Sequence, residues 1–363
     1  MRTLTFNPED QVPPFVPDRG PQHAKLAIVG EAPGTQESIF RKPFIGPAGS
    51  ELDRMLKDAG LDPKEIYFTN VFPYQPPENQ IKSFFCSKAS KLYDPEFPPM
   101  GAGQYILNGF GDHVRNLRQR LALLPNLQLI CPVGNTALWA ITGKTGIGAL
   151  RGTISPSLGN LHPNLPTYHP SAVLRTWAYR SVVVSDFQKA KDYISGGINL
   201  PSKSEFTLHL DQSLDQLNKL VQIALGSPRM AIDVETEASQ IRTVGIAYSP
   251  TEAFVIPFFC SKSGVSNYWQ NPLDEIEAWK LVKILCESDV PKVLQNGLYD
   301  IQRLLDPYGI IVKNVKDDTM LLHHALQPEM PKSLDFLAST YLNTEAWKAE
   351  YRRSGSEQHK RDE

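Results

Sequence analysis

Hydrophobic and polar residues follow two distinct patterns along the first 200 residues. Continuous apolar runs predict buried strands at 25–30, 65–71 and 127–134, and the end of a further strand at 166–171. Apolar residues at helical spacing predict helices at 50–60, 113–124, 136–143 and about 178–194. This alternation indicates a parallel sheet covered by helices on both faces, with ligands bound beyond the carboxyl ends of the strands.

The second half of the chain repeats the α/β style in a different order. The same patterns predict helices at 211–226, 272–288, 297–309, 317–326 and 333–342. Strands are predicted at 229–237 and 292–296, and a hairpin at 241–249 and 252–259. The Gly/Pro/Ser-rich stretch at 195–205 separates the two halves.

We therefore expect an α/β protein made of two three-layer αβα domains. The predicted limits are a first domain at 1–197, a linker at 198–205, a second domain at 206–350 and a tail at 351–363. The tail is rich in charge and is expected to be disordered.

Composition narrows the class of protein further. No apolar run approaches the roughly 20 residues that a membrane span needs, and the first ten residues lack the apolar core of a signal peptide. The cysteines Cys86, Cys131, Cys260 and Cys286 are far apart, which argues against a disulfide framework and fits a reducing compartment. We expect a cytoplasmic protein without membrane attachment.

Charge differs between the two halves of the chain. Residues 1–200 carry 20 Lys/Arg and 16 Asp/Glu, whereas residues 201–363 carry 17 and 23. A mildly basic first half is compatible with a polyanionic partner but does not show one. An acidic second half is compatible with clustered carboxylates and a bound metal ion.

The stretch IVGEAPGTQESIFRKPFIGPAG, residues 28–49, combines a strand end with two Gly/Pro-rich turns. A simple strand-to-helix turn is the less specific interpretation. A Walker-type phosphate loop is excluded here because no Gly-Lys-Ser/Thr follows, and Gly143-Lys144-Thr145 has Leu138 where that motif needs glycine. Two further polar residues, Asn70 and His169, fall at other strand ends of the same predicted sheet.

Together these residues suit a nucleobase that has been turned out of a DNA helix. Phe44 offers a ring for stacking, and the Asn70 amide offers both a donor and an acceptor to read a pyrimidine edge. The imidazole of His169 could stabilise negative charge on a departing base. Either Glu31 or Glu37 could orient water and support a cationic sugar.

Glycine would let the backbone approach such a base closely. Gly30, Gly34 and Gly46 are placed in these turns to do so.

Four motifs in order, GEAPG-x-x-E, KPFIGPAG, TNVFPYQPPEN and YHPSAVLR, resemble the uracil-DNA glycosylase superfamily, and most closely its family-four branch. The resemblance spans roughly residues 20–195. It implies excision of uracil from DNA without a metal or other cofactor. It also implies that Phe44 stacks on uracil, that Asn70 reads it and that His169 lies at its O2 atom.

The same resemblance extends to other residues of these motifs. Gly30 and Ala32 would join the uracil-binding residues, and Glu31 and Glu37 fall on the carboxylates of the motif. The YHPSAVLR motif would lie at the DNA minor groove, where Ser171, Val173, Leu174 and Arg175 are the expected contacts. Val173 or Leu174 would be the wedge, and Arg175 would bind phosphate.

One feature of the family-four branch is missing from this sequence. Its members usually hold an iron–sulfur cluster on four cysteines, two of them before the first strand, where this chain has VPPFVPDRGPQHAK. Cys86 and Cys131 alone cannot supply four thiolates, so we predict no cluster.

A second set of acidic residues lies on the predicted strand RMAIDVETE. Asp233 and Glu235 are two apart, so both side chains point to the same face. Two carboxylates on one face repel each other unless a cation lies between them, although a solvated edge strand is the less specific alternative. Asp300 lies four residues after Asn296 on a predicted helix and could complete the set.

The pattern D-x-E followed by N-x-x-x-D resembles the proofreading 3′–5′ exonuclease domain of DNA polymerase I-type enzymes. That resemblance implies Asp233, Glu235 and Asp300 as ligands of Mg²⁺ or Mn²⁺, with a structural role at best for Asp318. The Tyr-x-x-x-Asp motif that completes the family's site has no match here, and Tyr341 with Glu345 has only its spacing. We expect an incomplete exonuclease, either a truncated piece or a nuclease fold without full chemistry.

A glycosylase module ahead of such a domain resembles the N-terminal part of certain bacteriophage DNA polymerases. We predict a uracil-excising enzyme that acts on DNA, with a possible polymerase module as partner. The alternatives are a non-catalytic module that binds uracil or DNA ends, and a protein that retains only the nuclease.

Overall fold

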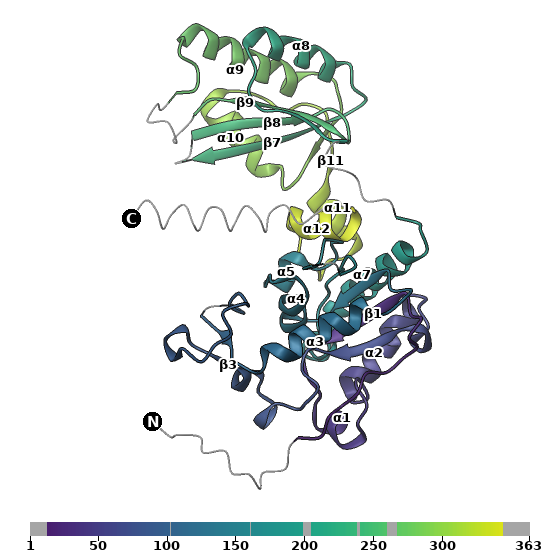
Figure 1. Cartoon of the computed structure of the whole chain (residues 1–363). Coiled ribbons are helices and arrows are strands. Elements are labelled where there is room, and N and C mark those ends of the chain that lie inside the picture. Colours follow the sequence, from purple (N-terminus) through teal and green to yellow (C-terminus); the bar gives the residue numbers. More distant parts are fainter. Residues whose placement is uncertain are drawn as a thin grey trace. The chain divides into compact units, whose positions relative to one another are not determined.

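The computed structural model describes residues 13–101, 103–159, 161–198, 205–237, 240–259 and 267–343 (Figure 1). These residues form two compact units. The first unit contains the described residues up to 198 and those from Asp335 on, and the second contains those between 205 and Leu334. The predicted tail at 351–363 lies outside the described residues.

The first unit is built on three parallel strands in the order β2-β1-β5. They are β1 (Leu26–Gly30), β2 (Tyr67–Asn70) and β5 (Leu129–Pro132). Beyond β5, an extended segment adds two parallel bridges, Ile130 with Asn164 and Val133 with Thr167. The predicted parallel sheet is confirmed, but the predicted strand end at 166–171 has only the bridge at Thr167, and a helix begins at Pro170.

Helices cover both faces of this sheet because successive residues of β1 point to opposite sides. Leu26 and Ile28 pack in one core cluster with residues of α2 (Pro47–Asp58) and α7 (Tyr179–Ile194). Ala27 and Val29 pack in another with residues of α3 (Gly111–Ala122) and α4 (Asn135–Thr142). The predicted arrangement of helices on both faces is therefore confirmed.

Several short elements of the first unit were not predicted from the sequence. The helices are α1 (Thr35–Phe40), α5 (Ile147–Leu150), α6 (Pro170–Arg175) and the 3₁₀ turns Pro63–Glu65, Pro77–Asn79, Ile81–Phe84 and Lys88–Ser90. Strands β3 (Phe85–Cys86) and β4 (Tyr105–Ile106) form a small antiparallel pair. Helix α12 (Leu334–Tyr341), from the far end of the described chain, belongs to this unit from Asp335 on.

The second unit contains a six-stranded mixed sheet in the order β11-β10-β7-β8-β9-β6. Its strands are β6 (Thr207–His209), β7 (Met230–Glu237), β8 (Gln240–Ala247), β9 (Glu252–Pro257), β10 (Lys292–Leu294) and β11 (Val315–Asp318). Its helices are α8 (Leu214–Leu225), α9 (Pro272–Glu287), α10 (Leu298–Tyr308) and α11 (Thr319–Leu326). The antiparallel pairing of β8 with β9 confirms the predicted hairpin.

Two strands of this sheet were not predicted: β6 lies where no element was expected, and β11 includes the first two residues of the helix predicted at 317–326. Strand β6 pairs with β9, and β11 pairs with β10, so α11 begins at Thr319 rather than at residue 317. In the part of the chain that the structure describes, no helix is both long enough and apolar enough to cross a membrane.

Candidate active site

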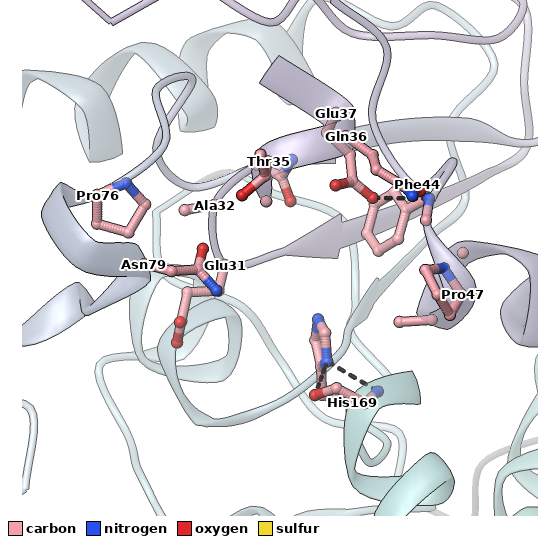
Figure 2. Close-up of a pocket in the computed structure, with 16 residues that line it drawn as sticks. Glu31, Ala32, Thr35, Gln36, Glu37, Phe44, Pro47, Pro76, Asn79 and His169 are labelled. Carbon is pink, nitrogen blue, oxygen red and sulfur yellow. Dashed lines mark hydrogen bonds between the residues drawn. The ribbon is translucent and has the colours of Figure 1, made fainter. Parts of the chain in front are cut away.

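A pocket of about 440 Å³ opens at the carboxyl ends of β1 and β2 in the first unit. Figure 2 shows side chains from α1, from the turn before α2, from the loop after β2 and from the start of α6 around one cavity. Its lining includes nine residues selected from the sequence: Glu31, Ala32, Gly34, Glu37, Phe44, Gly46, Asn70, His169 and Ser171. Residues 140 positions apart in the chain thus meet where a ligand of a parallel sheet is expected.

Phe44 holds an unusual backbone conformation at the pocket wall. Its φ of 55° lies in the left-handed region, which bulky residues rarely adopt and which stores strain of about 1–3 kcal/mol. Gly49 makes this turn possible, because a Cβ atom there would lie 2.1 Å from the carbonyl of Phe44. The ring packs on Phe68 with centroids 5.7 Å apart, so the core supports its position.

Asn70 and Phe44 both approach β1 at Gly30. A Cβ atom on Gly30 would lie 2.4 Å from Oδ1 of Asn70 and 2.6 Å from Cζ of Phe44. Gly30 therefore allows an amide and an aromatic ring to converge, although it does not itself line the cavity. Asn70 is only 8% exposed at the end of β2, where it is paired in register with Gly30.

Glu37 is fixed by backbone donors at the start of α2. Its Oε1 accepts from the N–H groups of Gly46 at 3.0 Å and Ile45 at 3.3 Å. A Cβ atom on Gly34 would lie 2.9 Å from Oε2, and one on Gly46 would lie 3.1 Å from Oε1. These two glycines, which were selected for close approach to a base, make room for this carboxylate, and their approach to a base stays a prediction.

Glu31 is held differently. Its Oε2 accepts a hydrogen bond from the Thr136 hydroxyl on α4, and its side chain is half-buried at the cavity. Asn79 also lines the pocket and was missed in the sequence. It follows Glu78 in the PPEN segment, and both residues have left-handed φ angles, 53° and 58°. Asparagine adopts this conformation in many loops, so the sequence alone did not mark Asn79 as a pocket residue.

His169 precedes α6 and faces the cavity (Figure 2). Its Nδ1 accepts from the Ser171 N–H at 3.1 Å and lies 2.7 Å from the Ser171 hydroxyl oxygen. Burial, reinforced by the positive charge of Arg175 and opposed by Glu37, lowers the pKa of His169 to about 4. The ring is therefore neutral at pH 7, and its proton lies on Nε2 because Nδ1 is the acceptor.

The rest of the YHPSAVLR motif separates into buried and exposed residues. Val173 is 0% exposed and packs in the same core cluster as Phe44, whereas Leu174 is 48% exposed. Val173 therefore cannot act as a DNA contact or wedge, and this part of the prediction is wrong because the helix turns that side chain into the core. Arg175 is exposed at the end of α6, and Ser171 lines the pocket.

The cysteines of the first unit lie in different surroundings. Cys131 is fully buried within β5, where burial raises the pKa of its thiol well above the usual range. Cys86 is half-buried in β3. The absence of an iron–sulfur cluster stays a prediction.

The three predicted metal ligands of the second unit lie on β7 and on helix α10, which contacts it. This strand lies between β10 and β8, so it is not an edge strand. Asp233 and Glu235 lie on its exposed face, and Asp300 of α10 is 5% exposed and accepts from the Val234 N–H at 2.9 Å. Burial, followed by the charges of Asp233 and Glu235, raises the pKa of Asp300 to about 6, against the lowering effect of the Val234 hydrogen bond.

Three carboxylates supply the hard oxygen atoms that Mg²⁺ and Mn²⁺ prefer. Among the described residues, however, no three acidic, histidine or cysteine side chains converge closely enough to hold one ion. Asp318 accepts from the N–H groups of Asn296, Gly297, Met320 and Leu321. It caps α11, in agreement with a structural role.

Two family matches cover the two halves of the chain. Residues 17–193 match the Uracil DNA glycosylase superfamily, and residues 210–363 match a 3′–5′ exonuclease family. The type-4 uracil-DNA glycosylase of Archaeoglobus fulgidus is 31% identical over 182 residues, which cover 48% of this chain and 79% of that enzyme. That of Saccharolobus solfataricus is 30% identical over 188 residues, 50% of this chain and 76% of that enzyme. The chain belongs to the uracil-DNA glycosylase superfamily.

A DNA polymerase of Bacillus phage SP01 is 24% identical over 347 residues. The match covers 88% of this chain but only 34% of that polymerase, so the chain spans about a third of this relative. The resemblance to a glycosylase joined to an exonuclease-type domain, as in a phage polymerase, is thereby confirmed.

Among solved structures, the catalytic core of RRP6 from Trypanosoma brucei overlaps with 39% of this chain and 36% of its own, at 20% identity and a TM-score of 0.30. A TM-score this low adds nothing to the family matches. The α/β fold class is as predicted: a uracil-DNA glycosylase-like parallel sheet is followed by an α/β unit with a mixed sheet, which matches a 3′–5′ exonuclease family.

Proposed function

We propose that the first unit hydrolyses the N-glycosidic bond of deoxyuridine in DNA. The observation that carries this proposal is the convergence of Phe44, Asn70 and a neutral His169 on one cavity. A ring, an amide and a neutral imidazole match the three needs of uracil: stacking, edge recognition and stabilisation of a developing negative charge. The relatives named type-4 uracil-DNA glycosylase support the same substrate.

Each of the three residues then has one role. Phe44 stacks on the uracil ring, and Asn70 pairs with its edge through the amide. As the bond between the sugar and N1 breaks, its electron pair passes to the base, and negative charge grows on O2. The Nε2–H of His169 donates to that oxygen, and because the ring starts neutral it stabilises the anion without first losing a proton.

The two glutamates are suited to different parts of the reaction. Glu37 receives two backbone N–H groups, which fix a negative charge that supports the cationic sugar. Glu31 has one hydroxyl partner and lines the pocket, so it keeps an oxygen atom to orient the attacking water and accept its proton. The Asn79 amide lines the same pocket and offers a second partner for that water.

Binding of DNA is proposed at the exposed end of α6. Leu174 is the wedge that fills the space left by the extruded nucleotide, and Arg175 binds a neighbouring phosphate. Ser171, beside His169, contacts the same strand.

For the second unit we propose binding of Mg²⁺ or Mn²⁺ near Asp233, Glu235 and Asp300. The support is their oxygen chemistry and the influence of the first two charges on the third. The ion would supply activated water at a DNA 3′ end when bound. Because the three carboxylates do not converge as they stand, we derive no cleavage step from them.

The test uses a labelled single-stranded oligonucleotide with one uracil, incubated with the full chain in EDTA and then treated with alkali. Strand breakage at the uracil is expected, and it should be lost in Asn70→Ala and His169→Ala while His162→Ala leaves it unchanged. An intact oligonucleotide, single- or double-stranded, would overturn the proposal and favour a binding module.

A further inference from the structure

A buried ionic cluster joins α7 to the turn that follows α5 in the first unit. Arg151 is 0% exposed, and its Nε donates to Oδ2 of Asp186 at 3.0 Å. Lys189, one turn further along α7, is 9% exposed and places a second cation there. Two buried cations beside one carboxylate need further acceptors, because an uncompensated buried charge is costly.

The Gly152 carbonyl accepts from Lys189 at 2.9 Å, and helix α12 supplies the other acceptors. Arg151 Nη1 donates to the hydroxyls of Ser339 at 3.1 Å and Thr340 at 3.3 Å. Nζ of Lys189 donates to the carbonyls of Ser339 at 2.7 Å and Leu342 at 2.8 Å. These carbonyls lie at the end of α12, the negative end of its dipole, where a cation is favoured.

The turn after α5 also fits α12 by shape. Gly152 has a φ of 71°, and a Cβ atom there would lie 2.9 Å from the Ser339 carbonyl and 2.7 Å from Asp186. The Arg151 guanidinium lies 5.1 Å from the ring centre of Phe336, which is 6% exposed. Figure 1 shows α12 beside α5, in agreement with these contacts. The glycine turn, the buried Phe336 ring and the hydrogen bonds from Arg151 and Lys189 thus hold α12 in place.

The same cluster reaches the segment that carries His169. The Thr167 hydroxyl donates to Oδ2 of Asp186 at 2.6 Å, and the Gly152 N–H donates to the Pro166 carbonyl at 2.9 Å. On its other side, Thr167 is bound to the backbone of Pro132 and Gly134. The two residues before Tyr168-His169 are therefore held between the sheet and the cluster that α12 completes.

We propose that α12 is a positioning element of the glycosylase centre: by accepting hydrogen bonds from Arg151 and Lys189 it keeps Asp186 on Thr167, and so fixes His169. The catalytic part of this inference rests on the proposed function. It means that a segment inside the exonuclease-family match completes the glycosylase-like unit. Residues 335–342 lie within the sequence match to the exonuclease family but pack in the first unit, so the family boundary is not the structural boundary.

The test compares three variants of the full chain. Ser339→Arg places a third cation against the cluster and should release α12. Ser339→Asp has a carboxylate for the same cations and should keep α12 bound. Tyr341→Arg adds the charge of the first variant on a side chain that is 53% exposed, and is the matched control. Amide hydrogen exchange, single-turnover uracil excision in EDTA and DNA affinity are measured for each.

Ser339→Arg should speed exchange both in α12 and in residues 166–171, and should lower the single-turnover rate about tenfold with unchanged DNA affinity. Ser339→Asp and Tyr341→Arg should resemble the unmodified chain. If Ser339→Arg fails to fold, the double variant Ser339→Ala/Thr340→Val is used, which removes only two hydroxyls. It should speed exchange in the same two segments and lower the single-turnover rate, each by two- to threefold.

Faster exchange in α12 alone, with residues 166–171 and excision unaffected, would overturn the inference. So would an α12 that exchanges without protection in the unmodified chain. If the unmodified chain releases no uracil, the proposed function fails, whereas the exchange measurements still decide whether α12 holds the His169 segment.

Discussion

The two acidic sites of the chain differ in what holds their carboxylates. In the first unit, Glu37 is bound by two backbone N–H groups and Glu31 by a threonine hydroxyl, within a cavity that also collects a ring, an amide and an imidazole. In the second unit, Asp233 and Glu235 are exposed on a strand, and Asp300 turns to a backbone N–H. A site whose partners are all in the protein can be preorganised, whereas carboxylates that share a cation depend on that cation to offset their repulsion.

The largest effect is expected from Gly30→Ala. The new methyl group would displace Asn70 and Phe44 together, so excision should fall by at least about 100-fold, the scale of losing one well-placed polar contact. Overpacking should also lower the free energy of unfolding by about 1–3 kcal/mol. Single-turnover kinetics and urea denaturation measure both effects.

Gly148→Ala is the matched control, because its nearest neighbour is a tyrosine oxygen at 3.8 Å. Unchanged excision in Gly30→Ala would contradict the claim that Asn70 and Phe44 form the base site.

A smaller effect separates the two neighbours on α6. Leu174→Ala should slow excision from double-stranded DNA about tenfold, equivalent to about 1.4 kcal/mol, and leave the free energy of unfolding unchanged, since Leu174 is exposed. Val173→Ala should instead destabilise the fold by about 1–2 kcal/mol through a small cavity. The reverse result would show that α6 presents its other face to DNA.

The pH dependence of excision should be weak from pH 8 to pH 6. The pKa of His169 is lowered in the folded chain to about 4, so the ring stays neutral over this range and becomes charged only as the pH falls through 4. Folding therefore loses stability between pH 6.5 and 4, where the unfolded chain takes up a proton that the folded ring does not bind. An NMR titration of His169 with a midpoint above 6 would contradict the lowered pKa on which the neutral imidazole donor rests.

The smallest effect is expected at the second site. Millimolar Mn²⁺ should raise the melting temperature by only a few degrees, because a ligand present near its dissociation constant stabilises by less than about 1 kcal/mol. Asp233→Asn should abolish that shift and leave uracil excision in EDTA unchanged. If uracil excision by Asp233→Asn were lower than that of the unmodified chain, or came to depend on Mn²⁺, the two sites would be coupled and our treatment of them as separate would be contradicted.

The sequence predicted the framework well where periodicity is strong. The runs that became β1 and β5, and the amphipathic stretches of α2 and α7, are long enough for pattern to decide. It also predicted that Asn70 and His169 line one site, because the carboxyl ends of all strands of a parallel sheet lie at one edge.

Other features had no local signal. Strand β6 is three residues long and exists through its pairing with β9. The left-handed backbone of Phe44 and the burial of Val173 depend on tertiary packing rather than on local preference. The place of α12 in the first unit depends on contacts with residues almost 190 positions away.

Release of free uracil tests the central claim most directly. The full chain is incubated in EDTA with a uracil-containing oligonucleotide, and the supernatant is analysed by mass spectrometry before any alkali treatment. We predict free uracil and an intact strand with an abasic site, absent in His169→Ala. Strand cleavage without free base, or no product at all, would contradict a metal-independent glycosylase in the first unit.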